Sequence, residues 1–129
     1  MTLIMLTFFP AVTLGEEINY QNIADAKSAR VENTLVRYFR IYGEPCANIQ
    51  TIKPKSWSII ETVRICQLDG LSFQSDVADA YFSNPEFSKK GINLQLSITP
   101  LAPTGEQKKK CFIPIKDKHI GAMTCMDEG

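Results

Sequence analysis

The chain has 129 residues, a length that suits one domain rather than two. It carries 14 Lys and Arg residues against 14 Asp and Glu residues, so any attraction to nucleic acid or to a membrane must come from a local patch. The apolar share of 44% and the charged share of 22% are ordinary for globular proteins, which excludes a disordered, collagen-like or coiled-coil chain.

The first fifteen residues, from Met1 to Gly15, form an uncharged and mostly apolar segment. This run is shorter than the roughly 20 residues of a membrane span and has the length of a signal-peptide core. The small residues Thr13 and Gly15 precede Glu16 as they would at a cleavage site. We therefore predict an export or anchor segment over residues 1–15 and a single domain over residues 16–129. A buried N-terminal strand and a membrane or filament-core helix are the alternatives.

Residues 20–42 carry apolar side chains at helical spacing. The apolar positions are Ala24, Val31, Leu35, Tyr38, Phe39 and Tyr42, and the charged residues Asp25, Lys27, Arg30, Glu32, Arg37 and Arg40 mostly occupy the other face. Gly43 and Pro45 follow as a glycine and a proline do at the end of a helix. The pattern predicts one long helix, about 34 Å from end to end.

After Pro45 the pattern changes to that of strands. Residues 58–67 are rich in β-branched side chains and end at the turn signal Asp69-Gly70. Residues 71–75 are a weaker strand candidate, and residues 76–82 suit either a helical turn or a strand that Asn84-Pro85 ends.

The alternation of apolar and polar residues over 92–99 predicts a strand with one buried and one solvated face. A loop with Pro100, Pro103 and Gly105 follows, and residues 110–115 and 119–126 supply the last short strands. With the helix first and the strands after it, the predicted class is α+β, with the long N-terminal helix packed on an antiparallel β-sheet.

The four cysteines agree with export, because an even number in a short chain with a signal-like start is typical of disulfides. They are Cys46, Cys66, Cys111 and Cys125. Three pairings are open, and local loop closure favours Cys46–Cys66 with Cys111–Cys125, each contributing on the order of 3 kcal/mol. No CxxC pair or Cys/His cluster is present, so we expect no metal site. Four reduced core thiols in a cytosolic protein are the alternative.

The charge distribution has one local anomaly near the C-terminus. Five lysines, Lys108, Lys109, Lys110, Lys116 and Lys118, stand against Glu106 and Asp117 in and beside the segment between Cys111 and Cys125. Such a patch could bind DNA phosphates through contacts that weaken with salt. Alternatively, these lysines protect a sheet edge from aggregation, and we favour this purely structural interpretation.

No catalytic constellation stands out in the sequence. The single histidine, His119, has no carboxylate or cysteine at triad or ligand spacing, and four paired cysteines leave no nucleophilic thiol. Gly91 and Gly105 stand alone, so no phosphate-cradling loop is formed. We therefore expect a protein that is not an enzyme and that has no cofactor.

Two segments of the chain resemble type IV pilins, including minor pilins and pseudopilins. INYQNIADAKSAR, residues 18–30, is similar to the stretch where the exposed pilin helix leaves the membrane-embedded part. GINLQLSITPLAPTG, followed by KKKC and a second cysteine, is similar to the late pilin strand and its disulfide-closed loop. Met1-Thr2-Leu3-Ile4 is also similar to a processed pilin N-terminus. The resemblance implies a pilin-like globular head in which Cys111–Cys125 holds a surface loop, and filament subunits as partners.

A secreted cystatin-like domain is the rival hypothesis, because it also combines one helix, an antiparallel sheet and two disulfides. Its protease-binding Gln-x-Val-x-Gly hairpin is absent from this chain, and a periplasmic inhibitor, immunity or binding protein has the same composition. The expectation is an exported bacterial protein, extracellular or periplasmic, that acts by binding a protein partner. DNA is the weaker candidate partner, and a membrane is contacted only through residues 1–15 if they are retained.

Overall fold

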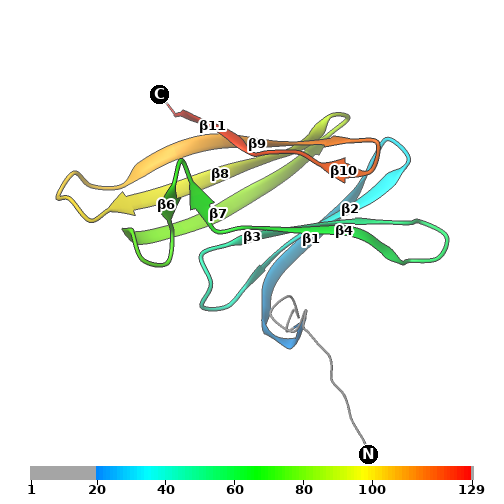
Figure 1. Ribbon diagram of the computed structural model, residues 1–129, viewed down its shortest axis with the longest axis horizontal. Coiled ribbons are helices and arrows are strands. Elements are labelled where there is room, and N and C mark those ends of the chain that lie inside the picture. The colour runs from blue at the N-terminus through cyan, green and yellow to red at the C-terminus, as the bar shows by residue number, and fades with distance from the viewer. Residues whose placement is uncertain (1–19, 129) are drawn as a thin grey trace, which may run out of the picture.

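The computed structural model describes residues 20–128, and these residues form a two-layer β-sandwich (Figure 1). One layer is a four-stranded antiparallel sheet in the order β1-β2-β3-β4. The other has the order β10-β9-β8-β7, with β11 also paired to β9. The first layer comprises β1 Ile23–Val31, β2 Thr34–Ile41, β3 Ala47–Ile52 and β4 Ile59–Ile65. The second comprises β7 Val77–Ser88, β8 Gly91–Pro100, β9 Gln107–Lys116, β10 His119–Ile120 and β11 Thr124–Asp127.

The predicted α+β class is wrong, because residues 20–42 form a β-hairpin instead of a long helix. After the 3-10 turn η2 Tyr20–Asn22, β1 and β2 pair antiparallel from Ile23 opposite Ile41 to Val31 opposite Thr34. The long helix that the pilin resemblance implies is therefore not formed between residues 20 and 42. The predicted export segment over residues 1–15, including the segment before Glu16, lies outside the described residues.

The error has a physical cause in the position of β2. This strand lies between β1 and β3, and both of its faces are covered. Val36 and Tyr38 face the core between the layers, while Phe39 and Ile41 are buried on the opposite face. A strand buried on both faces loses the period of two, and its apolar residues then match helical spacing by coincidence. Its β-branched and aromatic composition was the signal for a strand.

The strands predicted after Pro45 are confirmed in outline. The segment 58–67 contains β4, and the segment 92–99 lies within β8. Asp69 and Gly70, both with positive φ, form the predicted turn between the two-residue strands β5 Gln67–Leu68 and β6 Leu71–Ser72. The last predicted segment, 119–126, divides into β10 and β11, which both pair with β9.

The prediction that Asn84-Pro85 ends its element is wrong, since β7 continues through both residues. The register with β8 shifts between Ser83 and Glu86, which marks a β-bulge. Asn84 takes a left-handed φ of 52° there, and Pro85 lies on an edge strand, where its missing N–H costs no ladder bond. The ammonium of Lys27 donates to the Pro85 carbonyl over 3.0 Å and so connects β1 to β7 across the layers.

The core fills the space between the two sheets. Buried residues from both layers make one cluster, with Val36, Tyr38 and Ile49 on one side and Phe82, Leu96 and Ile113 among those on the other. The layers also meet at the side opposite β1 and β7, where the Glu61 carboxylate of β4 accepts the N–H of Ile120 over 2.7 Å.

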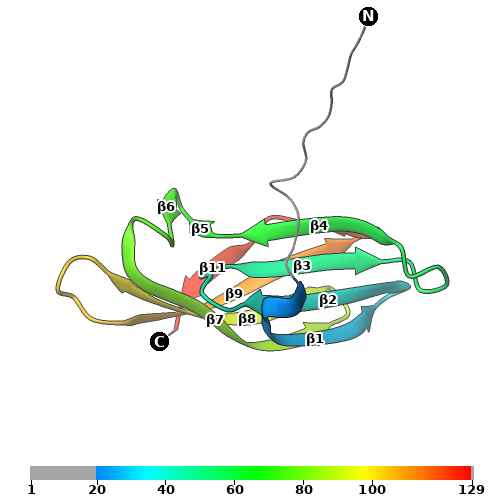
Figure 2. The same ribbon diagram turned by 90° about the horizontal axis from the view of Figure 1, so that it is seen from below.

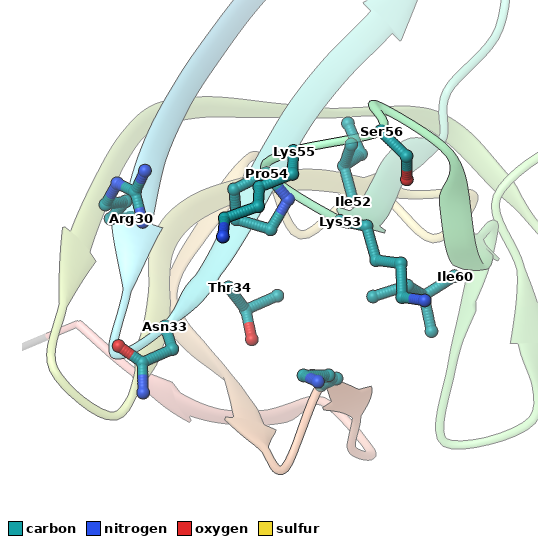
Figure 3. A pocket seen from close by; sticks show the side chains of 10 residues that line it. Arg30, Asn33, Thr34, Ile52, Lys53, Pro54, Lys55, Ser56 and Ile60 are labelled. Atoms are coloured by element: carbon teal, nitrogen blue, oxygen red, sulfur yellow. The ribbon is translucent and has the colours of Figure 1, made fainter.

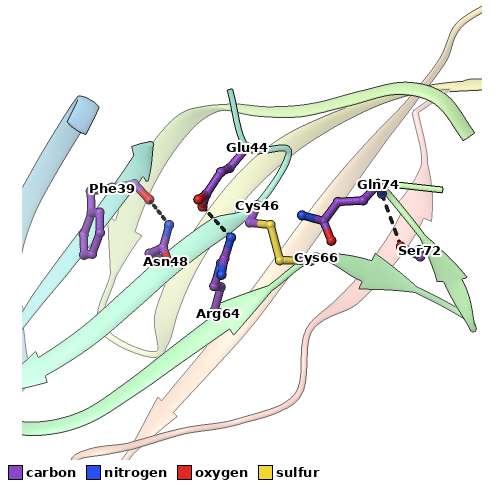
Figure 4. The surroundings of a disulfide bond; sticks show 8 residues. All are labelled: Phe39, Glu44, Cys46, Asn48, Arg64, Cys66, Ser72 and Gln74. Carbon is purple, nitrogen blue, oxygen red and sulfur yellow. Dashed lines mark hydrogen bonds and ion pairs between the residues drawn. A yellow bond between two sulfur atoms is a disulfide. The ribbon is translucent and has the colours of Figure 1, made fainter. Parts of the chain in front are cut away.

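Two disulfides close the strand ends in the pairing that local closure favours. Cys46 and Cys66 join the start of β3 to the end of β4 (Figure 4). Near this bond an ion pair joins Arg64 to Glu44. The second disulfide joins Cys111 of β9 to Cys125 of β11, which are direct cross-strand partners.

Candidate functional site

A pocket lies at one end of the sandwich, where three turns from both sheets meet (Figure 3). The turns are the β1–β2 turn at Glu32 and Asn33, the β3–β4 loop over residues 53–58, and the β9–β10 turn at Asp117 and Lys118. The cavity has a volume of about 520 Å³. Its lining comprises Arg30, Asn33, Thr34, Ile52, Lys53, Pro54, Lys55, Ser56, Ile60 and Lys118. The long axis in Figures 1 and 2 runs from this end to the β8–β9 loop at the other.

The three turns depend on left-handed backbone at residues other than glycine. Six such residues occur in the described part of the chain, and four of them lie in these turns: Glu32, Trp57, Asp117 and Lys118. Asp117 and Lys118, with φ of 52° and 70°, have the pattern of the two-residue turn that joins β9 to β10. Left-handed backbone at such residues costs roughly 1–2 kcal/mol each. Its concentration at one end of a fold is typical of functional sites.

Four cations surround the pocket without counterions. Arg30, Lys53, Lys55 and Lys118 all contribute to its lining. Within residues 20–128 none of the four has an ion-pair partner or a side-chain hydrogen bond. Unpaired charges of one sign around a concave surface attract and concentrate ligands of the opposite sign.

Among the other described cations, Arg40, Arg64 and Lys109 form ion pairs, whereas several exposed lysines, including Lys108 and Lys110, form none. The pocket is therefore distinguished by the convergence of four cations on one cavity. The Nε atom of Arg40 lies 2.9 Å from Oδ1 of Asp25, and the Nζ atom of Lys109 lies 2.6 Å from Oδ1 of Asp127. Near the pocket the carboxylate of Glu61 lies 4.0 Å from Nδ1 of His119. This carboxylate therefore faces β10 and does not neutralise the lining cations.

The floor of the pocket is apolar and its hydrogen-bonding groups are neutral. Ile52 and Thr34 are buried, and Pro54 and Ile60 complete the apolar wall. The Thr34 and Ser56 hydroxyls can donate to an anion, while the lining contains no carboxylate, thiol or imidazole. Such a site suits an anionic group that carries an apolar portion.

The five lysines singled out in the sequence do not form one patch. Lys108 and Lys110 share one face of β9 near the β8–β9 loop, and Lys109 points to the other face and pairs with Asp127. Lys116 lies at the far end of the same strand, about 20 Å from Lys110 at 3.4 Å per residue. Among the five, only Lys118 lines the pocket.

Sequence reasoning missed the other three cations of the site. Arg30 was assigned to the polar face of the predicted helix, and Lys53 and Lys55 were not singled out. The segment Lys53-Pro54-Lys55, followed by the single tryptophan of the chain and bounded by strands, was the available signal for an exposed basic loop.

The disulfides indicate the compartment in which the site operates. All four cysteines are oxidised in intramolecular bonds, which is typical of a non-reducing location, extracellular or periplasmic. No helix within residues 20–128 is long and apolar enough to cross a bilayer. The same residues contain no group of three His, Cys, Asp or Glu side chains that could hold a metal ion. Comparison of the chain with family models, with curated proteins and with solved structures gives no match.

Proposed function

We propose that this protein is an exported, non-enzymatic binding module that recognises an anionic group of its partner through the pocket at the end of the sandwich. The observation that supports the proposal is the convergence of four unpaired cations, Arg30, Lys53, Lys55 and Lys118, from three turns onto one cavity. Their positions far apart in the sequence make the cluster a product of the fold.

The surrounding structure supports a permanent site. The Cys46–Cys66 bond closes one end of the β3–β4 hairpin, and the loop with Lys53 and Lys55 lies at the other end. Two main-chain bonds hold that loop: Lys53 N donates to Ser58 O over 2.9 Å, and Trp57 N donates to Lys53 O over 2.8 Å. A preorganised loop loses little conformational entropy when it binds.

The test is retention on a heparin column, with a matched pair of double variants. Lys53→Gln with Lys55→Gln removes two charges from the pocket, and Lys108→Gln with Lys110→Gln removes two exposed lysine charges at the other end. We expect the pocket variant to elute at clearly lower salt than the wild type, because a protein with fewer cations at the site releases fewer counterions from heparin when it binds. The control variant should elute close to the wild type.

The opposite order of elution would contradict the proposal. If the control variant lost retention and the pocket variant did not, the anion-binding surface would lie along Lys108–Lys110. A second column that carries duplex DNA tests the DNA hypothesis with the same two variants.

A further inference from the structure

The β3–β4 loop exposes the single tryptophan of the chain beside the pocket. Trp57 is 67% exposed, and its backbone has a left-handed φ of 61°. The loop is closed by the main-chain bonds from Lys53 to Ser58 and from Trp57 to Lys53, so its backbone has a defined shape. In Figures 1 and 2 this loop reaches further along the long axis than the other turns at its end. A flat partner that approached this end would therefore meet the loop that carries Trp57 first.

Two more apolar side chains are exposed next to the loop. Ile59 and Ile60, the first residues of β4, are 48% and 36% exposed. Large apolar side chains that gather on an exposed surface mark a site of interaction with a protein or a membrane. Tryptophan is enriched at membrane–water interfaces, because its ring is apolar and its N–H is polar.

The four unpaired cations of the pocket lie at the same end of the sandwich as Trp57 and Ile59. Arg30, Lys53, Lys55 and Lys118 come from both sheets, and long basic side chains can reach from an apolar surface to polar groups around it. The acidic residues of this end are Glu32 and Asp117 in the turns and Glu61 on β4, whose oxygen is bound by Ile120 N. Cations around a protruding tryptophan complement an anionic bilayer, in which lipid phosphates lie above an apolar layer.

We propose that this end of the sandwich docks on an anionic lipid bilayer, with Trp57 and Ile59 at the interface and the four cations on lipid phosphates. The proposal rests on the anion-binding function proposed above and names its partner. A groove-bound acidic segment would account for the pocket but would leave the protruding indole without a role. The bilayer accounts for both features.

The experiment follows the fluorescence of Trp57 as vesicles are added to the full chain. Because the chain contains one tryptophan, the signal reports on this loop alone. Vesicles of phosphatidylglycerol mixed with phosphatidylcholine should shift the emission to shorter wavelength, and brominated lipids should quench it. Vesicles of phosphatidylcholine alone should change neither.

Variants locate the contact. Lys53→Gln and Lys55→Gln should each weaken partitioning onto the anionic vesicles by about fivefold. The control pair Lys108→Gln and Lys110→Gln should change it little, because these lysines lie beyond a Debye length of roughly 10 Å from the β3–β4 loop. Trp57→Asn should reduce co-sedimentation with the vesicles, and asparagine tolerates the left-handed backbone, so the loop keeps its shape.

The outcomes separate this proposal from the one on which it rests. An unshifted emission with anionic vesicles, together with retention on heparin through Lys53 and Lys55, would overturn the membrane proposal and identify a soluble anionic macromolecule as the partner. An unshifted emission together with heparin retention that does not depend on Lys53 and Lys55 would overturn both proposals. Vesicle binding that depends on Lys108 and Lys110 instead would also overturn the docking geometry.

Discussion

Among the glycines of residues 20–128, Gly91, the first residue of β8, is the one where an added Cβ makes the shortest contact. Its φ of 157° is one that residues with a side chain rarely adopt. A Cβ atom at this position would lie 2.1 Å from the main-chain oxygen of Ile113 on the neighbouring strand β9. Backbone cannot rotate away as a side chain can, so Gly91→Ala forces β8 and β9 apart.

The size of the destabilisation follows from the backbone displacement that the added methyl group requires. Relief of the contact requires a displacement of about 1 Å at Gly91, where close packing leaves no free space. The displacement weakens the bond from Ile115 N to Lys90 O, 2.9 Å long, and loosens the packing of the fully buried Ile92 and Ile113. Backbone strain of about 1–3 kcal/mol and one or two weakened hydrogen bonds of about 1 kcal/mol each predict a loss of roughly 2–5 kcal/mol.

The assay is urea unfolding followed by circular dichroism, with Gly105→Ala as the control. Gly105 has a φ of 82° and no atom within 4 Å of its added Cβ, so its variant should lose only about 1–2 kcal/mol through backbone strain. Equal losses from the two variants would refute the reasoning, because they would mean that β9 does not approach β8 as closely at Ile113 as the structure places it.

The remaining predictions concern a buried hydroxyl and a disulfide. The Tyr38 hydroxyl is buried without a hydrogen-bond partner, so Tyr38→Phe should stabilise the protein by about 1 kcal/mol and raise Tm by roughly 4 °C. Burial, and secondly the charge of Asp25, raise the pKa of Tyr38 above its ordinary 10.0, with Arg40 opposing them. The stability that depends on neutral Tyr38 is thus present below pH 10 and is lost above it by about 1.4 kcal/mol per pH unit. The difference in Tm between Tyr38→Phe and the wild type should therefore grow from pH 10 to 11. A constant difference in Tm would contradict this. Cys111→Ala with Cys125→Ala opens a closed loop of 14 residues and should cost about 3 kcal/mol in urea unfolding, whereas an unchanged midpoint would show that the bond adds no stability.

The proposed functions depend on the gathering of cations around one pocket at one end of the sandwich. At the end near the β8–β9 loop, Lys109 pairs with Asp127 and the carboxylate of Glu106 accepts the Ser97 hydroxyl, while Lys108 and Lys110 are unpaired. At the opposite end four cations remain unpaired around an apolar floor. With a formal net charge of zero for the whole chain, recognition of an anion must come from this local separation of charge.

Strands with one buried and one solvent-exposed face were predictable from the sequence, and strands buried on both faces were not. The alternation in β8 predicted its register on the core correctly, with Leu94 and Leu96 inside. The same reasoning failed for β2, because η2 brings Tyr20 over Phe39 on the outer face, with the ring centroids 6.0 Å apart. A residue that another segment covers is indistinguishable in sequence from a residue that faces the core.

The sequence by itself determined the features that arise within a short stretch of chain. These are the alternating strand over residues 92–99, the Asp69-Gly70 turn, and the two disulfides closed between cysteines near each other in the sequence. Only the tertiary structure decided that residues 20–42 form a hairpin and that Arg30, Lys53 and Lys118 surround one pocket. Local patterns reflect the energetics of neighbouring residues, whereas strand pairing and the meeting of three turns depend on contacts between segments that are far apart in the chain.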